Sequence, residues 1–141
     1  VITVPDSKLY KLYVSVRTRI TKEGIVLNPA KIRLMRRMIR DRNFRKRSLD
    51  ETMSMYNSVQ AGENKYIMPY KTRSDYDIDT FLAYEMSVYR YNLLDDLRLM
   101  ENKQELSDVI EILSSLAPMD NELVPRDALI REFIGKGEFK Y

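Results

Sequence analysis

The chain has 141 residues, of which 32% are charged and 44% hydrophobic, a balance typical of a folded domain with one core. It contains no cysteine and no histidine, which excludes disulfides, zinc or histidine-bound metal sites, and Ser-His-Asp or Cys-His catalysis. No apolar run is long enough to span a bilayer and we find no signal-peptide core, so we expect a cytoplasmic protein without a membrane partner.

The first predicted elements are a strand and a helix. Lys8–Thr18 alternates around Tyr13 and Val14, which predicts a strand with at least one buried face. Thr21–Asn28 is a turn built on Gly24, followed by a segment that leads into the helix. Asn28 is a favourable N-cap and the proline after it suits the first helical position.

This helix has an apolar stripe and an arginine stripe. Ile32, Met35 and Ile39 recur at i, i+3 and i+7, a spacing that predicts a packed face. The arginine stripe has the same helical period, and its members are Arg33, Arg36, Arg37 and Arg40. Like charges at this spacing repel, so an opposing anion would stabilise the helix.

The later elements are predicted from caps and periodicity. Ser48 and Glu51 have capping-box spacing, so a second helix is expected from there to about Val59. The segment from residue 60 to 75 is expected to be irregular, and Tyr76–Arg90 is expected to form strand structure. Helical periods follow in 91–102 and 105–119, the second ending at Pro118, and a short final helix ends before Gly135.

The positive charge is concentrated in one window. Lys31–Arg47 contains nine basic residues and one acidic residue, a net charge of +8, whereas the whole chain carries +3 and the remainder therefore −5. Arginine holds phosphate oxygens bidentately, so the window predicts contact with phosphate. From composition alone three interpretations stay open: a solvated basic face, a nucleic-acid site, or a nucleotide site.

Complete phosphoryl-transfer machinery is absent from this sequence. None of the four glycines lies in a G-x-x-x-x-G-K-[ST] loop, and the G-K-G-E-F segment at Gly135 fits a helix C-cap better. Asp75, Asp77 and Asp79 alternate and would share one strand face. A metal site there is conceivable, but pairing with neighbouring basic residues such as Arg73 is the favoured interpretation, and we assign no metal ligand.

Three separated motifs resemble the uridine kinase and phosphoribulokinase family. They are R-L-M-R-R-M-I-R-D-R-N-F-R at Arg33–Arg45, S-V-Q-A-G-E-N-K-Y-I-M-P-Y at Ser58–Tyr70, and L-I-R-E-F-I-G at Leu129–Gly135. They occur in the family's order and span nearly the whole chain. The chain thus resembles a longer subgroup of uridine kinase-like nucleoside kinases.

The resemblance implies an α/β fold, the C-terminal portion of a P-loop kinase, with few parallel strands, lid helices and a helical C-terminal tail. Residues 1–92 would hold the strands and the arginine-rich lid, and residues 93–141 the tail of the same domain. The implied reaction transfers the γ-phosphoryl group of ATP, with Mg²⁺, to the 5′-hydroxyl of uridine or cytidine. The implied sites are Arg37 and Arg40 as catalytic residues, Arg33, Arg36, Arg45 and Arg47 at the ATP phosphates, and Arg47 and Met55 on the nucleoside side.

The chain departs from the family pattern in three respects. The phosphate loop and the general base have no counterpart in it, Met55 stands where uridine–cytidine kinases have glutamine, and Lys46 stands where the family usually has glycine. We therefore expect the chain to be a C-terminal part, inactive alone and without bound cofactor, that shares ATP and nucleoside with an N-terminal part. Strands at Lys11–Thr18 and Tyr76–Thr80 are expected to lie adjacent and parallel, with an open edge that invites a second copy.

A second hypothesis is a non-catalytic basic module that binds nucleic acid or another polyanion. It predicts binding that weakens steeply with salt, which filter binding at two salt concentrations would reveal. The net charge of −5 outside the basic window opposes a long polyanion but not a compact triphosphate. Nucleic acid is therefore not the expected partner.

Overall fold

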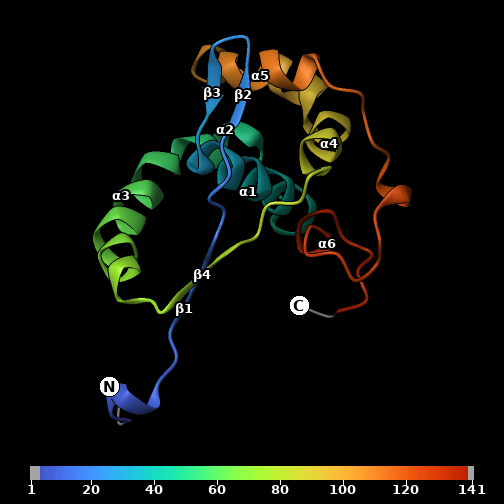
Figure 1. Ribbon diagram of the computed structural model, residues 1–141. Coiled ribbons are helices and arrows are strands. Elements are labelled where there is room, and N and C mark those ends of the chain that lie inside the picture. Colours follow the sequence, from blue (N-terminus) through green and yellow to red (C-terminus); the bar gives the residue numbers. More distant parts are fainter. Residues whose placement is uncertain (1–3, 140–141) are drawn as a thin grey trace.

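The computed structural model describes residues 4–139 and shows a mixed α/β chain (Figure 1). Its strands are β1 (Leu12–Ser15), β2 (Ile20–Lys22), β3 (Ile25–Leu27) and β4 (Tyr76–Asp79). Its α-helices are α1 (Pro29–Arg45), α2 (Leu49–Ser54), α3 (Tyr56–Tyr66), α4 (Glu85–Leu99), α5 (Ser107–Ser114) and α6 (Arg131–Ile134). Among the described residues, no helix has the length and apolarity needed to cross a membrane.

The core lies between α1, α4 and α5. Met38 and Ile39 of α1, Leu93 and Leu97 of α4, and Leu113 of α5 are completely buried. The β2–β3 hairpin packs against α5 at the top of Figure 1, whereas α3 lies on the other side of α1. Burial of this many apolar side chains is the main force that holds the three helices together.

The predicted parallel pair of strands is confirmed. β1 and β4 pair in parallel, with Leu12 opposite Tyr76 and Val14 opposite Ile78. Within the predicted strand Lys8–Thr18 only Val16 is buried, and it follows β1, whereas all four of these side chains are exposed. The two-stranded sheet therefore presents an apolar face to solvent, which is unusual because parallel sheets are normally covered on both faces.

The predicted strand over Tyr76–Arg90 is wrong beyond Asp79, because α4 begins at Glu85. Its β-forming residues are spaced for a helix as well, and Met86, Tyr89 and Leu93 are all buried against the core. Packing of a helical face outweighs β-propensity, which depends strongly on context. α4 continues through residues 92 and 93, where the resemblance implies the end of the lid-bearing part.

Two other segments are more regular than predicted. The segment expected to be irregular from residue 60 continues as α3 to Tyr66 and then forms a 3₁₀ turn over Met68–Arg73. Gly62 lies inside α3, where a glycine costs only about 1 kcal/mol. The Gly24 turn is a two-residue hairpin loop in which Glu23 and Gly24 both have positive φ angles, the geometry that matches strand twist.

The C-terminal part contains less helix than the periodicity predicts. α5 ends at Ser114, four residues before Pro118, whereas the last short helix, α6, ends at Ile134, directly before Gly135, as predicted. Gly135 has a φ of 84°, a conformation that favours glycine. The segment after α6 turns back toward the end of α1 (Figure 1).

Candidate phosphate-binding site

Two helix caps define the turn that carries the arginines. The side chain of Asn28 accepts a hydrogen bond from the backbone N–H of Lys31 at 3.2 Å, so α1 begins as predicted. α1 ends at Arg45 and is capped by Lys46, whose φ of 54° is left-handed. This conformation favours glycine, which the resemblance places at this position, and a lysine here costs about 1–2 kcal/mol. The chain then enters the capping box of α2 at Ser48.

Asp41 gathers three arginines at this turn. Its carboxylate is fully buried, 3.0 Å from Arg45 Nη1, 3.6 Å from Arg47 Nη1 and 3.8 Å from Arg40 Nε. Only the contact with Arg45 is a hydrogen bond. The backbone N–H of Arg47 also donates to the Asp41 carbonyl oxygen, which keeps the turn closed. Of the arginines that the resemblance implies for the site, Arg40, Arg45 and Arg47 therefore lie together at Asp41, whereas Arg37 does not join them.

The three guanidinium groups keep unused donors. Arg45 and Arg47 have half-exposed side chains. The Nε atom of Arg40 is buried without a hydrogen-bond partner among the described residues, and its guanidinium lies 3.7 Å from Glu132. The ion pairs of the described residues join the three arginines to two carboxylates, Asp41 and Glu132. Such a cluster can bind an oxyanion through planar N–H donors.

Arg36, expected at the phosphates, is bound inside the protein. It makes hydrogen bonds of 2.5 and 2.9 Å to Glu85, donates to the Thr80 side chain and carbonyl, and lies over the Phe133 ring. Burial lowers the pKa of Arg36, but the hydrogen bonds and charge of Glu85 and Tyr89 outweigh this and raise it. A phosphate contact would require breaking these bonds, so we place Arg36 with the scaffold.

The other predicted positions lie away from the Asp41 cluster. Arg33 forms a 2.8 Å ion pair with Glu63 of α3. Arg37 makes no ion pair within residues 4–139, and it lines a shallow hollow with Arg33 and Tyr56. Met55 lies at the junction of α2 and α3, next to Tyr56 in the chain. The arginine stripe therefore does not form one surface, since only Arg40 of its four members lies at Asp41.

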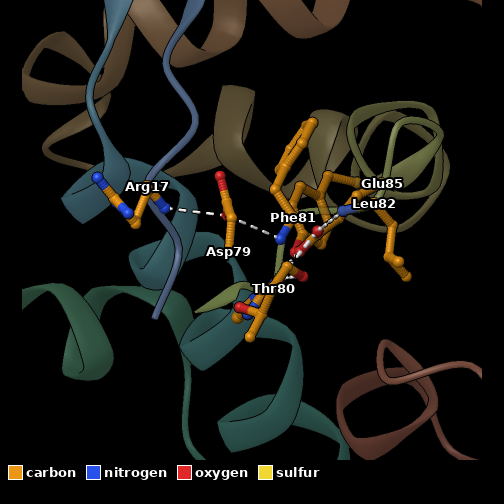
Figure 2. A network of polar contacts seen from close by, with 8 residues as sticks. Arg17, Asp79, Thr80, Phe81, Leu82 and Glu85 are labelled. Atoms are coloured by element: carbon orange, nitrogen blue, oxygen red, sulfur yellow. Dashed lines mark hydrogen bonds and ion pairs between the residues drawn. The ribbon is translucent and has the colours of Figure 1, made fainter. Parts of the chain in front are cut away.

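The alternating aspartates join the ends of β1 and β4. Asp79 accepts hydrogen bonds from the backbone N–H groups of Arg17 and Phe81 (Figure 2) and from the Thr18 hydroxyl. Burial raises the pKa of Asp79, but these hydrogen bonds lower it by a larger amount, so the net shift of the pKa is downward. Asp77 forms a 2.9 Å ion pair with Arg17. Asp75 accepts a hydrogen bond from the backbone N–H of Lys11, so the three aspartates bond to both ends of β1, and in the described part of the chain Arg73 forms no ion pair with them. No metal-binding group of three or more such side chains occurs among the described residues.

A pocket of about 530 Å³ beside the cluster was missed by the sequence reasoning. Arg40 and Arg45 line it, together with Phe44 and with Lys136 and Phe139 from the segment after α6. The G-K-G-E-F segment was the available signal, but the sequence does not show that α6 packs against α1. This pocket extends the arginine cluster toward two exposed aromatic rings.

No family model, curated protein or solved structure matches this chain.

The capping box provides a test of the turn geometry through pH. The Glu51 carboxylate accepts a 2.7 Å hydrogen bond from the backbone N–H of Ser48, and this contact, with that to the Ser48 side chain, lowers the Glu51 pKa below its usual 4.5. A lowered pKa stabilises the fold at neutral pH, and the contribution is lost as pH falls through the folded-state value. We expect Glu51→Gln to lower the Tm near pH 7, with the difference shrinking toward about pH 2, measured by circular dichroism.

The exposed Glu101 offers a matched control for this experiment. Glu101→Gln is expected to change the Tm little at either pH. A difference between wild type and Glu51→Gln that does not depend on pH would contradict the capping role of the charge.

Proposed function

We propose that this chain is the lid-bearing C-terminal part of an ATP-dependent kinase that phosphorylates the 5′-hydroxyl of uridine or cytidine in the cytoplasm. The observation that carries the proposal is the cluster of Arg40, Arg45 and Arg47 around the buried Asp41 carboxylate. The resemblance of the three sequence motifs supports the choice of substrate class. ATP, Mg²⁺ and the nucleoside would be shared with a part that contains the phosphate loop and the general base.

Phosphoryl transfer needs positive charge close to the transferred group. Its transition state spreads negative charge over the equatorial oxygens, and catalysis consists largely of positioning and charge stabilisation. Arg40 and Arg45 project from the last turns of α1, and Arg47 follows the reversal at Lys46. All three would act as one group, because their guanidinium groups are held within a few ångströms of the same carboxylate.

Asp41 keeps this cluster assembled when no ligand is bound. Three guanidinium groups brought together without an anion would repel one another, and a buried carboxylate is stable only when paired. Arg45 and Arg47 retain about half of their exposure beside it, so their outer nitrogens are accessible to phosphate oxygens. Asp41 is therefore a positioning residue in this proposal.

The sheet offers a place for the remaining part of the kinase. The apolar face formed by Leu12, Val14, Tyr76 and Ile78 is exposed, and β1 has a free edge beside it among the described residues. A strand that carries the phosphate loop would extend the parallel sheet at this edge, and the helix that follows such a strand would cover the apolar face. Alternatively, β1 of a second copy of the chain would pair with this edge in place of the strand that carries the phosphate loop.

The distribution of ion pairs favours a small anion over nucleic acid. Several residues of the +8 window are paired inside the protein: Lys31 with Asp108, Arg33 with Glu63, Arg36 with Glu85, and Arg42 with Asp96. They point to different elements and do not form one continuous basic surface. A nucleic acid contacts phosphates along an extended face, whereas a triphosphate needs only the local cluster.

Two measurements test the proposal. We expect the gene to encode a G-x-x-x-x-G-K-[ST] motif upstream of Val1, and a protein that includes it to transfer phosphate from ATP to uridine or cytidine. The 141-residue chain alone is expected to show no transfer in the same assay, because it has no phosphate loop. A protein with the upstream residues that binds ATP but phosphorylates no pyrimidine nucleoside would overturn the proposal.

A further inference from the structure

The pocket beside the arginine cluster is formed by two distant parts of the chain. The last turns of α1 contribute Arg40, Phe44 and Arg45. Residues 131–139, in and after α6, contribute the other wall, and α1 and α6 pack directly against each other. The pocket has a volume of about 530 Å³, within the range of small-molecule sites.

The far wall is a fixed turn. The buried Arg131 donates hydrogen bonds to the carbonyl oxygens of Pro125 and Gly135, each at 3.2 Å, and to that of Asn121 at 2.9 Å. The backbone N–H of Glu138 donates to the Arg126 carbonyl at 2.8 Å, which folds the segment back. These bonds hold the segment after α6 in place.

Two glycines allow this turn to approach its neighbours closely. A Cβ atom on Gly135 would lie 3.3 Å from the Phe44 ring, and one on Gly137 would lie 3.0 Å from the Arg131 side chain. Gly135 also has a positive φ angle, which a side chain would strain. The two glycines of the G-K-G sequence therefore allow the turn to pack against α1. This structural role explains their presence in a chain that has no phosphate loop.

The pocket combines aromatic surface with positive charge. Phe44 is 57% exposed and Phe139 is 59% exposed, although phenylalanine gains free energy from burial. Arg40 and Arg45 lie beside them, and the Lys136 ammonium is held only in a surface ion pair with Glu122. Arg131 is occupied by carbonyl oxygens, so Arg40, Arg45 and Lys136 are the cations of the pocket with unused donors.

We propose that this pocket binds a nucleotide, with its base against Phe44 and Phe139 and its phosphates toward Arg40 and Arg45. Aromatic rings stack on any nucleobase, and guanidinium groups bind phosphate oxygens, so the two features together match this class of ligand. The inference rests on the proposed function, in which the nucleotide is the phosphate donor, and adds that the C-terminal turn holds its base. It therefore differs from the resemblance, which implies no bound cofactor, in that the chain alone should bind ATP.

Glu132 acts against the ligand in this proposal. Its carboxylate lies 3.7 Å from Arg40 Nη1 and lines the same pocket. A phosphate group that approaches Arg40 has to displace this contact or accept its repulsion. Removing the charge of Glu132 should therefore tighten nucleotide binding.

Titration calorimetry on the 141-residue chain tests the proposal, with ATP and inorganic tripolyphosphate as the two probes. We expect Phe44→Leu and Phe139→Leu each to weaken ATP binding by about fivefold or more, the lower end of what loss of one stacking contact produces. Neither should change the affinity for tripolyphosphate, which has no base. Glu132→Gln should tighten the binding of both probes.

Tyr66→Leu is the matched control, because Tyr66 is a similarly exposed aromatic residue on α3 that does not line this pocket. It should leave both affinities unchanged. Amide chemical shifts of Gly135 and Gly137 on addition of ATP to the wild-type chain give a second measurement that does not depend on a variant folding. Both shifts should move with ATP.

Three results would overturn the proposal: no saturable binding of ATP at millimolar concentration, phenylalanine variants that bind ATP like wild type, or unmoved glycine shifts at saturating ATP. Failure here is distinguishable from failure of the proposed function. If the longer protein is a nucleoside kinase but Phe44→Leu keeps its KM for ATP, only the pocket assignment is wrong. If ATP binds in the pocket but no nucleoside is phosphorylated, only the kinase proposal is wrong.

Discussion

Arg40→Ala should lower the kcat of the kinase that contains the upstream phosphate loop by about 10²-fold or more, because an arginine that stabilises phosphoryl-transfer charge contributes at least this much. Arg40 is the member of the cluster with the weakest internal contacts, at 3.7 Å to Glu132 and 3.8 Å to Asp41. Its guanidinium can therefore move to a phosphate group without breaking a hydrogen bond. Steady-state kinetics with ATP and uridine would measure the loss.

The division of the effect between kcat and KM identifies when the contact forms. A fall in kcat with little change in the KM for ATP means that Arg40 acts mainly in the transition state, whereas a rise in KM alone means uniform binding. Arg42→Ala is the control on the same helix, since Arg42 bonds to the Asn92 carbonyl and Asp96 on α4. Its effect on kcat should stay within a few-fold. Near-normal turnover of Arg40→Ala would remove Arg40 from the mechanism.

Local signals in the sequence predicted the elements that carry the site. Asn28 with the following proline, and Ser48 with Glu51, begin helices as expected, because caps depend on residues within one turn of each other. The parallel pairing of β1 with β4 was also predicted, but it came from the family resemblance. Periodicity could not have given it, since it does not specify which strands are neighbours.

The composition of the site could not be predicted in the same way. Arg36 and Arg40 both belong to the arginine stripe, yet one is bonded to Glu85, 49 residues away, and the other is only loosely held by Glu132. Which arginine keeps unused donors is decided by the carboxylates that tertiary packing places beside it. For the same reason Tyr76–Arg90 was predicted as strand, since its helical face is buried only when α4 meets α1.

The buried contacts of Glu85 predict the largest effect on stability. Its side chain is fully buried and accepts hydrogen bonds from Arg36, from the Leu82 N–H (Figure 2) and from the Tyr89 hydroxyl. Burial and the charge of Glu85 raise the pKa of Tyr89 well above its usual value, so the hydroxyl stays protonated and donates. Removing one member of a buried ion pair leaves the other uncompensated, which costs about 3–5 kcal/mol.

We therefore expect Glu85→Ala to lower the free energy of unfolding by about 3–5 kcal/mol and the Tm by about 10 °C, measured by urea and thermal denaturation. Glu63→Ala is the matched control, because it breaks the partly exposed pair with Arg33 and should cost only about 0–1 kcal/mol.

A double variant separates the ion pair from the packing. Arg36→Met combined with Glu85→Leu replaces both charges by apolar groups of similar size. The loss in free energy of unfolding of the double variant should therefore be smaller than the sum of the losses of the two single variants. Additive losses would show that Arg36 and Glu85 contribute independently, and the scaffold role given to Arg36 would then be wrong. Arg36 would in that case return to the group of arginines available for phosphate, and the cluster at Asp41 would no longer be the only one to test.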